Sequence, residues 1–350
     1  MKKFIITNFV FLLCIFSVFS EVSFREVYNG YYRMMTVLGI NDPGQINFHA
    51  KSTEKNTIIN EGIWKGIEKE NLLGGNAPVR LCFEYPELFL TANTARNWGG
   101  NDGSFWQGRG INSIFSFGME LSGNFFSLNL SPEVWFSQNL DYEIIGTVSS
   151  NGYGDYWTVF DNLQRQGENY IYNFSWGQSG VHIFYKDLGI GFTTENIVLG
   201  PSKFNNILLS DNAEGFPHFD FGTMNKISVG NLGYGEFKMI WGFLKESEFF
   251  DIDSSNDYGW ISGSYLSFTP AIMPYLSLGF NHQYYKPLSD WDTWDLIRGI
   301  PFVDRSNSGT DTKDMMISIT FDFLFPAVGF ELYGEWARND NFKDIQDFNS

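Results

Sequence analysis

Hydrophobic residues occupy every second position in several stretches of the chain. In residues 314 to 325 and 330 to 336, apolar side chains alternate with polar or small ones, and residues 326 to 329 form a tight turn between them. The apolar positions are Met315, Ile317, Ile319, Phe321 and Phe323, then Phe330, Leu332 and Trp336. The same alternation recurs at residues 115 to 121, 126 to 130, 237 to 243 and 276 to 280. A period of two predicts β-strands with two different faces, paired as antiparallel hairpins.

The connections between these segments are alternately short and long. We expect strands near 222 to 231, 235 to 246, 258 to 269, 274 to 286, 314 to 325 and 330 to 338. Counted back along the chain, this alternation of short and long connections places long loops at 94 to 111, 137 to 170 and 199 to 221. A soluble β-sandwich also alternates, but its loops are short at both ends. Short turns at one end and long loops at the other favour an outer-membrane β-barrel.

The N-terminus has the composition of a secretory signal peptide. Two lysines precede an apolar run, and Ser20 offers a small residue for cleavage. A lipoprotein anchor at Cys14 is the competing interpretation, which the preceding leucine disfavours because a small residue is needed there. We therefore expect a signal peptide over residues 1 to 20 and one barrel domain over residues 21 to 350.

Composition supports a location in the outer membrane. Aromatic residues make up 18% of the chain and glycines number 36. No stretch after the leader approaches the roughly 20 apolar residues of a spanning helix. The formal net charge is −17, and removal of the two leader lysines makes it −19, so we expect no nucleic-acid partner. The expected fold is an all-β, antiparallel transmembrane barrel with a short helical segment over residues 52 to 73.

Two separated segments resemble a known family. The first is "NDGSFWQGRGIN", residues 101 to 112, followed by "LSPEVWFSQN", and the second is "GPSKFNNILLSDNAEGFPHF", residues 200 to 219. Together they resemble the capsule-assembly Wzi family of outer-membrane proteins, from about Tyr28 to the C-terminal end. The resemblance implies a large, partly plugged barrel that acts at the cell surface in attachment or assembly of capsular or other exopolysaccharide. Family members with a periplasmic helical bundle need a longer helical region than this chain offers, so functions of that bundle are not carried over.

The segment from 94 to 112, which includes the first of these motifs, and the second motif contain the chemistry of a carbohydrate site. Flat indole faces cover the C–H faces of sugar rings, while amide and guanidinium groups pair with hydroxyls. The same residue types also occur in loops that plug a barrel and in aromatic girdles at the membrane interface, so a structural role stays open for each residue. The candidate polysaccharide-binding residues are Trp98, Trp106, Gln107, Arg109, Asn205, Asn206 and Asn212.

Three functions compete. The leading one is a non-enzymatic surface protein that binds or helps assemble polysaccharide, surrounded by outer-membrane lipid and lipopolysaccharide-like glycolipid. The alternative is a porin or channel for small solutes, suggested by charged residues on the inner face of the expected strands, namely Lys238, Asp322, Glu331 and Glu335. An outer-membrane hydrolase needs a Ser–His pair across neighbouring strands, and only His182 and His282 stand on expected strands.

No cofactor and no metal site is expected. Residues 251 to 259 imitate the start of a calcium loop, but Asn256 stands where glycine is needed and Ser262 where the closing glutamate belongs. Many surface polysaccharides are anionic, and an acidic protein repels them. We therefore expect glycan binding that depends on divalent ions or is insensitive to the charge of the glycan.

The number of strands raises a question about barrel closure. We count about 13 strand-like segments, beginning with a hairpin near 31 to 39 and 46 to 53, whereas bacterial single-chain barrels have an even number. The last strand, 330 to 338, would end on the long-loop side as an edge facing lipid, which leaves backbone groups unpaired. We expect the chain to be a truncated part of a longer barrel, and a missed strand in 137 to 149 is the alternative.

Overall fold

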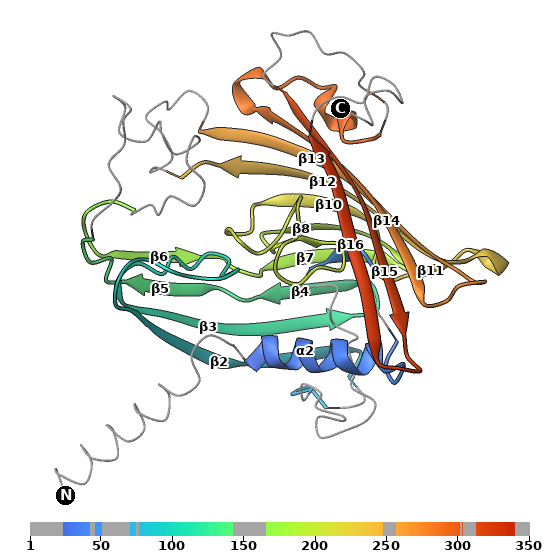
Figure 1. Ribbon diagram of the computed structural model, residues 1–350, viewed down its shortest axis with the longest axis horizontal. Coiled ribbons are helices and arrows are strands. Elements are labelled where there is room, and N and C mark those ends of the chain that lie inside the picture. Colours follow the sequence, from blue (N-terminus) through green and yellow to red (C-terminus); the bar gives the residue numbers. More distant parts are fainter. Residues whose placement is uncertain are drawn as a thin grey trace, which may run out of the picture.

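A large, curved antiparallel sheet dominates the computed structural model (Figure 1). The structure describes residues 24–42, 46–50, 71–74, 77–142, 166–247, 257–301, 303 and 313–339. The main sheet has 14 strands, which confirms the all-β antiparallel fold predicted from the alternation. The expected signal peptide and nearly all of the expected helical segment at 52 to 73 lie outside the described residues.

The strands of the main sheet are long at its two ends and short between β4 and β11. The first half of the main sheet contains β2 (Val79–Asn93), β3 (Gly110–Gly123), β4 (Phe126–Leu130), β5 (Glu133–Ser137), β6 (Ile171–Ser175), β7 (Gly180–Tyr185) and β8 (Leu188–Thr193). The second half contains β10 (His218–Thr223), β11 (Ile227–Ser228), β12 (Gly233–Lys245), β13 (Tyr258–Pro270), β14 (Leu276–Pro287), β15 (Asp314–Phe325) and β16 (Phe330–Asn339). A separate two-stranded sheet pairs β1 (Phe48–His49) with β9 (Val198–Leu199). The helical elements are α2 (Phe24–Val37), η3 (Gly230–Leu232), η4 (Leu288–Asp290) and α3 (Asp295–Arg298).

Neighbouring strands of the main sheet follow one another along the chain. β4 and β5 both pair with β3 and form two halves of one strand path, interrupted at Pro132, which has no N–H to donate to a ladder. β6 and β7 continue the sheet beside β5 and β4, and β8, β10, β12, β13, β14, β15 and β16 follow in order. Among the described residues, β2 pairs only with β3 and β16 only with β15, so these two strands form the long edges of the sheet; the short strands β6 and β11 are also paired on one side only. That the chain is part of a longer barrel stays a prediction.

The alternation of short and long connections is confirmed by the strand bounds. Short connections join β3 to β4, β7 to β8, β10 to β12, β13 to β14 and β15 to β16. Long ones join β2 to β3, β5 to β6, β8 to β10, β12 to β13 and β14 to β15. Because consecutive strands are antiparallel, all long connections leave the sheet at one end, which we call the long-loop end. The strand expected at 222 to 231 was placed wrongly: β10 ends at Thr223, and only β11 lies in the rest of that range.

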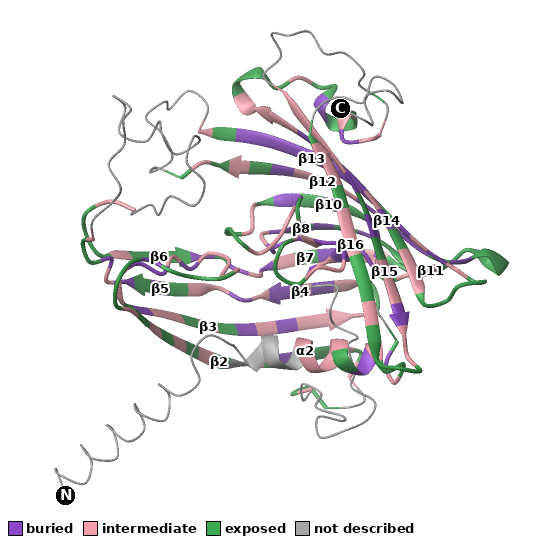
Figure 2. Cartoon of the chain, viewed as in Figure 1, coloured by how far each residue is buried: buried purple, intermediate pink, exposed green. Residues whose placement is uncertain are grey.

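The two faces of the sheet have inverted polarity relative to a soluble protein. Along β8, Leu188, Ile190 and Phe192 are exposed while the glycines and the threonine between them are buried. On β10 the phenylalanines are exposed while His218 and Asp220 are buried. Figure 2 shows this alternation of exposed and buried positions along the strands. A soluble sheet buries its apolar face and exposes its polar one, so the soluble β-sandwich does not account for this chain.

A small apolar cluster fills part of the inner side of the sheet. β1 and β9 pack against inward-facing residues of β12 and β13, and the cluster consists of Phe48, Ala50, Ile197, Leu199, Leu208, Ile240 and Tyr265. Polar side chains of the wall hold the segment at 46 and 47: the backbone N–H groups of both residues donate to Glu236, and Asn47 Nδ2 donates to Asn281 Oδ1 over 2.6 Å. We call residues 46–50 with 197–209 the inner plug.

The predicted hairpin at 31 to 39 and 46 to 53 is wrong. Residues up to Val37 form helix α2, and in the described part of the second segment, residues 46–50, only two residues form a strand, which pairs with β9. The apolar residues near Met34 fit a helical repeat as well as an alternation, because a short window does not separate the two periods. The helix ends at Val37, and the following turn is closed at Gly39, which adopts a φ of 71°, with Ile40 N–H donating to the carbonyl of Met35 over 2.9 Å.

Candidate functional site

The two segments singled out in the sequence are joined in the structure. Residues 97–107 follow β2 and residues 200–217 follow β9, and both belong to connections that leave the sheet at the long-loop end. Residues 200–209 of the second segment are also part of the inner plug. Gly103 N–H donates to the carbonyl of Asp211 over 2.7 Å, and Asn101 Nδ2 donates to the carbonyl of Phe204 over 3.2 Å. Gly103 has a φ of 62°, which glycine adopts without strain. The two segments therefore form one surface, which we call the joined loops.

A third segment, in the break between β6 and β7, supports the joined loops. The side-chain oxygen of Gln178 accepts from Asn196 N–H over 3.0 Å, and its amide donates to Asn196 Oδ1 over 2.7 Å. The amide of Asn196 in turn donates to the carbonyl of Ala213 over 2.6 Å. The sequence interpretation did not single out Gln178 or Asn196, because nothing in their local pattern shows that segments so far apart meet.

Gln107 and Asp102 shape the first loop. Gln107 is buried, its oxygen accepts from Thr91 Oγ1 over 2.6 Å, and its amide donates to Asp102 Oδ2 over 2.8 Å. Gly100 N–H donates to the same carboxylate oxygen over 2.7 Å. A Cβ at Gly99 would lie 2.5 Å from that oxygen, so a larger residue there would displace the carboxylate. Gln107 thus has both ends of its amide engaged within the loop.

Two other candidate residues also bind the protein backbone. Arg109 donates from Nε to the carbonyl of Thr94 over 3.1 Å and from a terminal nitrogen to the carbonyl of Asp141. Asn206 donates to the carbonyls of Leu199 and Ser202 over 2.6 and 3.1 Å. These contacts order the loops, and they reduce the number of donors that Arg109 and Asn206 present to a ligand.

The remaining candidates are more accessible. Trp98 is 56% exposed, and Asn205 and Asn212 are exposed on the second segment. Trp106 is half-buried, and its indole N–H finds no hydrogen-bond acceptor among the described residues. The neighbouring Phe105 is buried, in edge contacts with Phe89 and Trp135. The joined loops therefore combine a rigid base with an exposed indole and two exposed amides.

Among the described residues, neither His182 nor His282, the two candidate bases, has a serine side chain as its hydrogen-bond partner. His182 Nε2 lies 2.8 Å from Asp220 Oδ2, and His282 Nδ1 lies 3.0 Å from the carbonyl of Gly299. The described residues also hold no group of three or more histidine, cysteine, aspartate or glutamate side chains suited to a metal ion. The chemistry that the joined loops do offer is apolar stacking and amide hydrogen bonding.

Comparison with known proteins finds similarity among solved structures. No family model matches the chain, and no curated protein matches it. Among solved structures, the chain is similar to Wzi, described as an outer-membrane protein involved in group 1 capsule assembly in Escherichia coli and as a carbohydrate-binding β-barrel. The match has 12% sequence identity and a TM-score of 0.46, and it covers 76% of this chain and 50% of Wzi. This chain thus spans about half the length of the protein it resembles.

Proposed function

We propose that this protein is a non-enzymatic outer-membrane surface protein that binds, or helps to assemble, capsular or other exopolysaccharide. The observation that carries the proposal is the joining of residues 97–107 to 200–217 at the long-loop end, with Trp98, Asn205 and Asn212 exposed on them. Long loops of outer-membrane barrels face the cell exterior, where such polymers are attached.

The polarity of the sheet supports insertion in a membrane. An apolar outward face is stable against lipid and unstable against water, because exposing apolar surface to water costs about 25 cal/mol per Å². Exposed aromatic residues such as Phe192 and Phe219, which pack against each other with ring centroids 4.9 Å apart, belong to this face. No helix among the described residues is long and apolar enough to cross a membrane.

The exposed groups of the joined loops suit sugars. An indole face covers the axial C–H groups of a pyranose ring, and amides both donate to and accept from hydroxyls. The hydrogen bonds among the loop segments hold these groups before a ligand arrives, which reduces the entropy lost on binding. The other expected neighbours of the protein are outer-membrane lipid and lipopolysaccharide-like glycolipid.

The porin alternative predicts charged side chains free in the lumen. Lys238 instead donates to Asp220 over 2.6 Å, Glu331 pairs with Arg33 over 2.8 Å, and Glu335 accepts from the backbone of the inner plug at Ile207 over 2.9 Å. The inner plug itself packs against the inward face of β12 and β13. These contacts favour a plugged barrel over an open channel.

A glycan-binding assay tests the proposal directly. The purified protein in detergent is screened against capsular and exopolysaccharide fragments, and Trp98→Ala and Trp106→Ala are compared with wild type. Trp176→Ala is the matched control, because Trp176 is as exposed as Trp98, at 59%, but lies in the break between β6 and β7. We expect binding to fall with the first two changes and to persist with the third. Normal capsule or exopolysaccharide in a deletion strain, together with no binding by the purified protein, would refute the proposal.

A further inference from the structure

The connection between β14 and β15 is folded tightly onto the outward face of the sheet, on the side of Phe243 and Leu266. Trp260 Nε1 and Ser262 Oγ of β13 donate to the carbonyl of Asp295 over 3.3 and 3.2 Å, and Trp241 Nε1 of β12 donates to the carbonyl of Leu296 over 2.7 Å. Gly299 lies so close to β13 that a Cβ there would be 2.8 Å from its backbone. Short helix α3 is thus held by the side chains of two strands.

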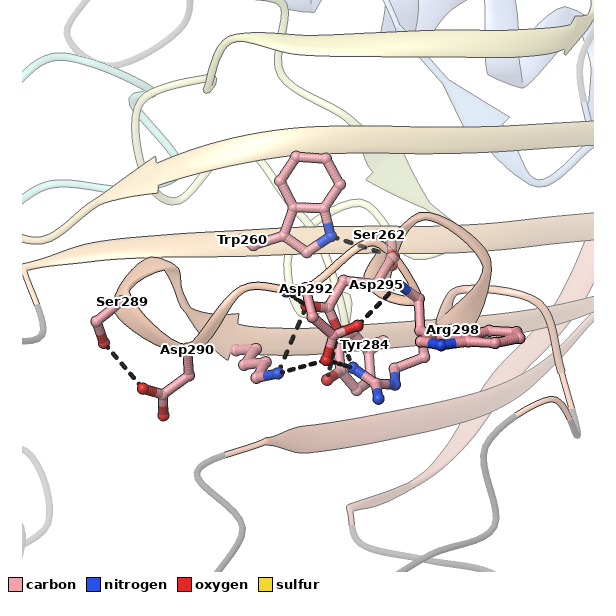
Figure 3. Close-up of polar contacts among 10 residues, drawn as sticks. Trp260, Ser262, Tyr284, Ser289, Asp290, Asp292, Asp295 and Arg298 are labelled. Carbon is pink, nitrogen blue, oxygen red and sulfur yellow. Dashed lines mark hydrogen bonds and ion pairs between the residues drawn. The ribbon is translucent and has the colours of Figure 1, made fainter.

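A buried carboxylate fixes the loop further. Asp295 accepts from Tyr284 of β14 over 3.0 Å and from Arg298, and its other oxygen accepts from the backbone N–H of Asp292 over 2.7 Å (Figure 3). Lys286 also lies 3.5 Å from this second oxygen. The position of Asp292 is therefore set by a residue that is itself fully buried.

Asp292 presents a second, accessible carboxylate in a fixed orientation. One oxygen accepts from Trp294 N–H over 2.7 Å, and the other accepts from Arg298 over 2.9 Å and from Lys286 over 3.4 Å. An ionised carboxylate has about four acceptor positions, so these three donors do not fill it. Its side chain is 43% exposed, and the donors around it are mostly covered.

Two indoles flank this carboxylate in the chain. Trp294 is 65% exposed, whereas Trp291 is partly covered and meets Trp260 edge to face with centroids 5.8 Å apart. An exposed indole next to an oriented carboxylate is a suitable arrangement for a sugar, whose C–H face stacks on the ring while adjacent hydroxyls donate to the carboxylate. Lys286 and Arg298 are already paired with Asp292 and Asp295, so no cation is left over for an acidic sugar.

We infer that residues 291–294 form a second sugar-binding site, specific for a neutral hexose unit with two adjacent free hydroxyls. The sugar ring stacks on Trp294 and its hydroxyls donate to Asp292. This inference rests on the proposed function and extends it, because the site lies at the same long-loop end as the joined loops. A polymer chain that reaches both sites gains avidity from the link between them.

The test uses the full chain in detergent and calorimetric titration with defined probes. The neutral probes are maltoheptaose, a manno-oligosaccharide and a galacto-oligosaccharide, and the acidic probe is an oligomer of glucuronic acid. We expect Trp294→Ala and Asp292→Asn each to weaken binding of a neutral probe about tenfold, since a hydrogen bond to a charged group contributes about 1.5 to 3 kcal/mol. Trp294→Phe, which keeps a flat ring, should retain most of the affinity, and binding should protect Trp294 from oxidation by N-bromosuccinimide.

The outcomes separate this inference from the proposed function. Unchanged binding by Trp294→Ala, together with loss of binding by Trp98→Ala, overturns the second site and leaves the joined loops as the binding surface. Preference for the glucuronic acid oligomer overturns the assignment to neutral sugars. Binding of none of the neutral probes by wild type overturns the second site, while the proposed function is decided by the capsular and exopolysaccharide fragments and the deletion strain. Near-ultraviolet circular dichroism of each variant shows that a lost affinity is not a lost fold.

Discussion

His182 on β7 and Asp220 on β10 are hydrogen-bonded, with 2.8 Å between Nε2 and Oδ2, although β8 runs between their strands. The contact passes over Gly191 of β8, where a Cβ would lie 2.3 Å from the imidazole ring and 2.5 Å from Oδ2. Lys238 of β12 completes the group, with Nζ 2.6 Å from the other oxygen of Asp220. All three polar side chains are buried on the inner face, so a glycine allows one ionic group to tie three strands together.

Gly191→Ala should destabilise the sheet by separating His182 from Asp220. A methyl group that overpacks a buried polar contact costs about 1 to 3 kcal/mol. Urea unfolding in detergent, followed by tryptophan fluorescence, measures the change. Ile190→Val, one residue away on the exposed face, is the control and should leave the unfolding midpoint almost unchanged. Equal midpoints for wild type and Gly191→Ala would show that the wall accommodates the methyl group.

The buried charges of Asp220 and Lys238 should depend on each other for stability. Asp220→Asn or Lys238→Met leaves the partner charge buried without compensation, which costs about 3 to 5 kcal/mol. The double variant removes both charges and should be more stable than the sum of the two single effects predicts. The free energies of unfolding of the four proteins form a double-mutant cycle. Additive losses would indicate that the two charges are not coupled.

The carboxylate of Glu236 should keep the inner plug in place. It accepts from Ile46 N–H over 3.0 Å, from Asn47 N–H over 3.3 Å and from Ser267 Oγ over 2.8 Å. Glu236→Gln places an amide donor against these donors, and we expect the plug to loosen and openings to appear in planar lipid bilayers.

Ser267→Ala is the control for that experiment, because it removes one donor and leaves the carboxylate that holds residues 46 and 47. We expect wild type and Ser267→Ala to be nearly silent in the bilayer. Large, steady openings of wild type would instead favour the porin.

The loop at residues 291–294 should be sensitive to acid. Desolvation acts to raise the pKa of Asp292, but the hydrogen bonds and charge of Arg298, with those from Trp294 N–H and Lys286, outweigh it and lower the pKa below its usual value. Because the pKa of Asp292 is lower in the folded protein than in the unfolded chain, its carboxylate contributes fully to stability above about pH 3.9, the usual pKa of aspartate. This contribution is lost as the pH falls through the pKa of Asp292 in the folded protein.

Acid should therefore release this loop, and tryptophan fluorescence measured against pH follows the change. Asp292→Asn should remove the transition in that window, since an amide does not titrate there. A transition that persists unchanged in Asp292→Asn would assign it to another group.

The sequence by itself determined the class of fold, the two faces of each strand and the alternation of short and long connections. In β15 and β16 the alternation places Ile319 and Trp336 on the exposed face and Ser318 on the buried one, because a strand has a fixed period of two residues. The lengths of the connections could be predicted for the same reason, because each strand begins and ends where the alternation of apolar and polar residues begins and ends. The two loop segments were also found from local composition.

Only the tertiary structure decided how distant segments meet. The apolar residues near Met34 belong to a helix, and Phe48 pairs with Leu199, because contacts far apart in the chain select between patterns that are locally equivalent. The side-chain amide of Gln107 is hydrogen-bonded to Thr91 and Asp102, whereas the side chain of Trp98 is exposed. No local sequence pattern shows which of these two residues is engaged within the protein. The hydrogen-bond partner of a polar side chain depends on the curvature and register of the whole sheet. The sequence therefore indicates candidate residues, and only the tertiary structure shows what each of them contacts.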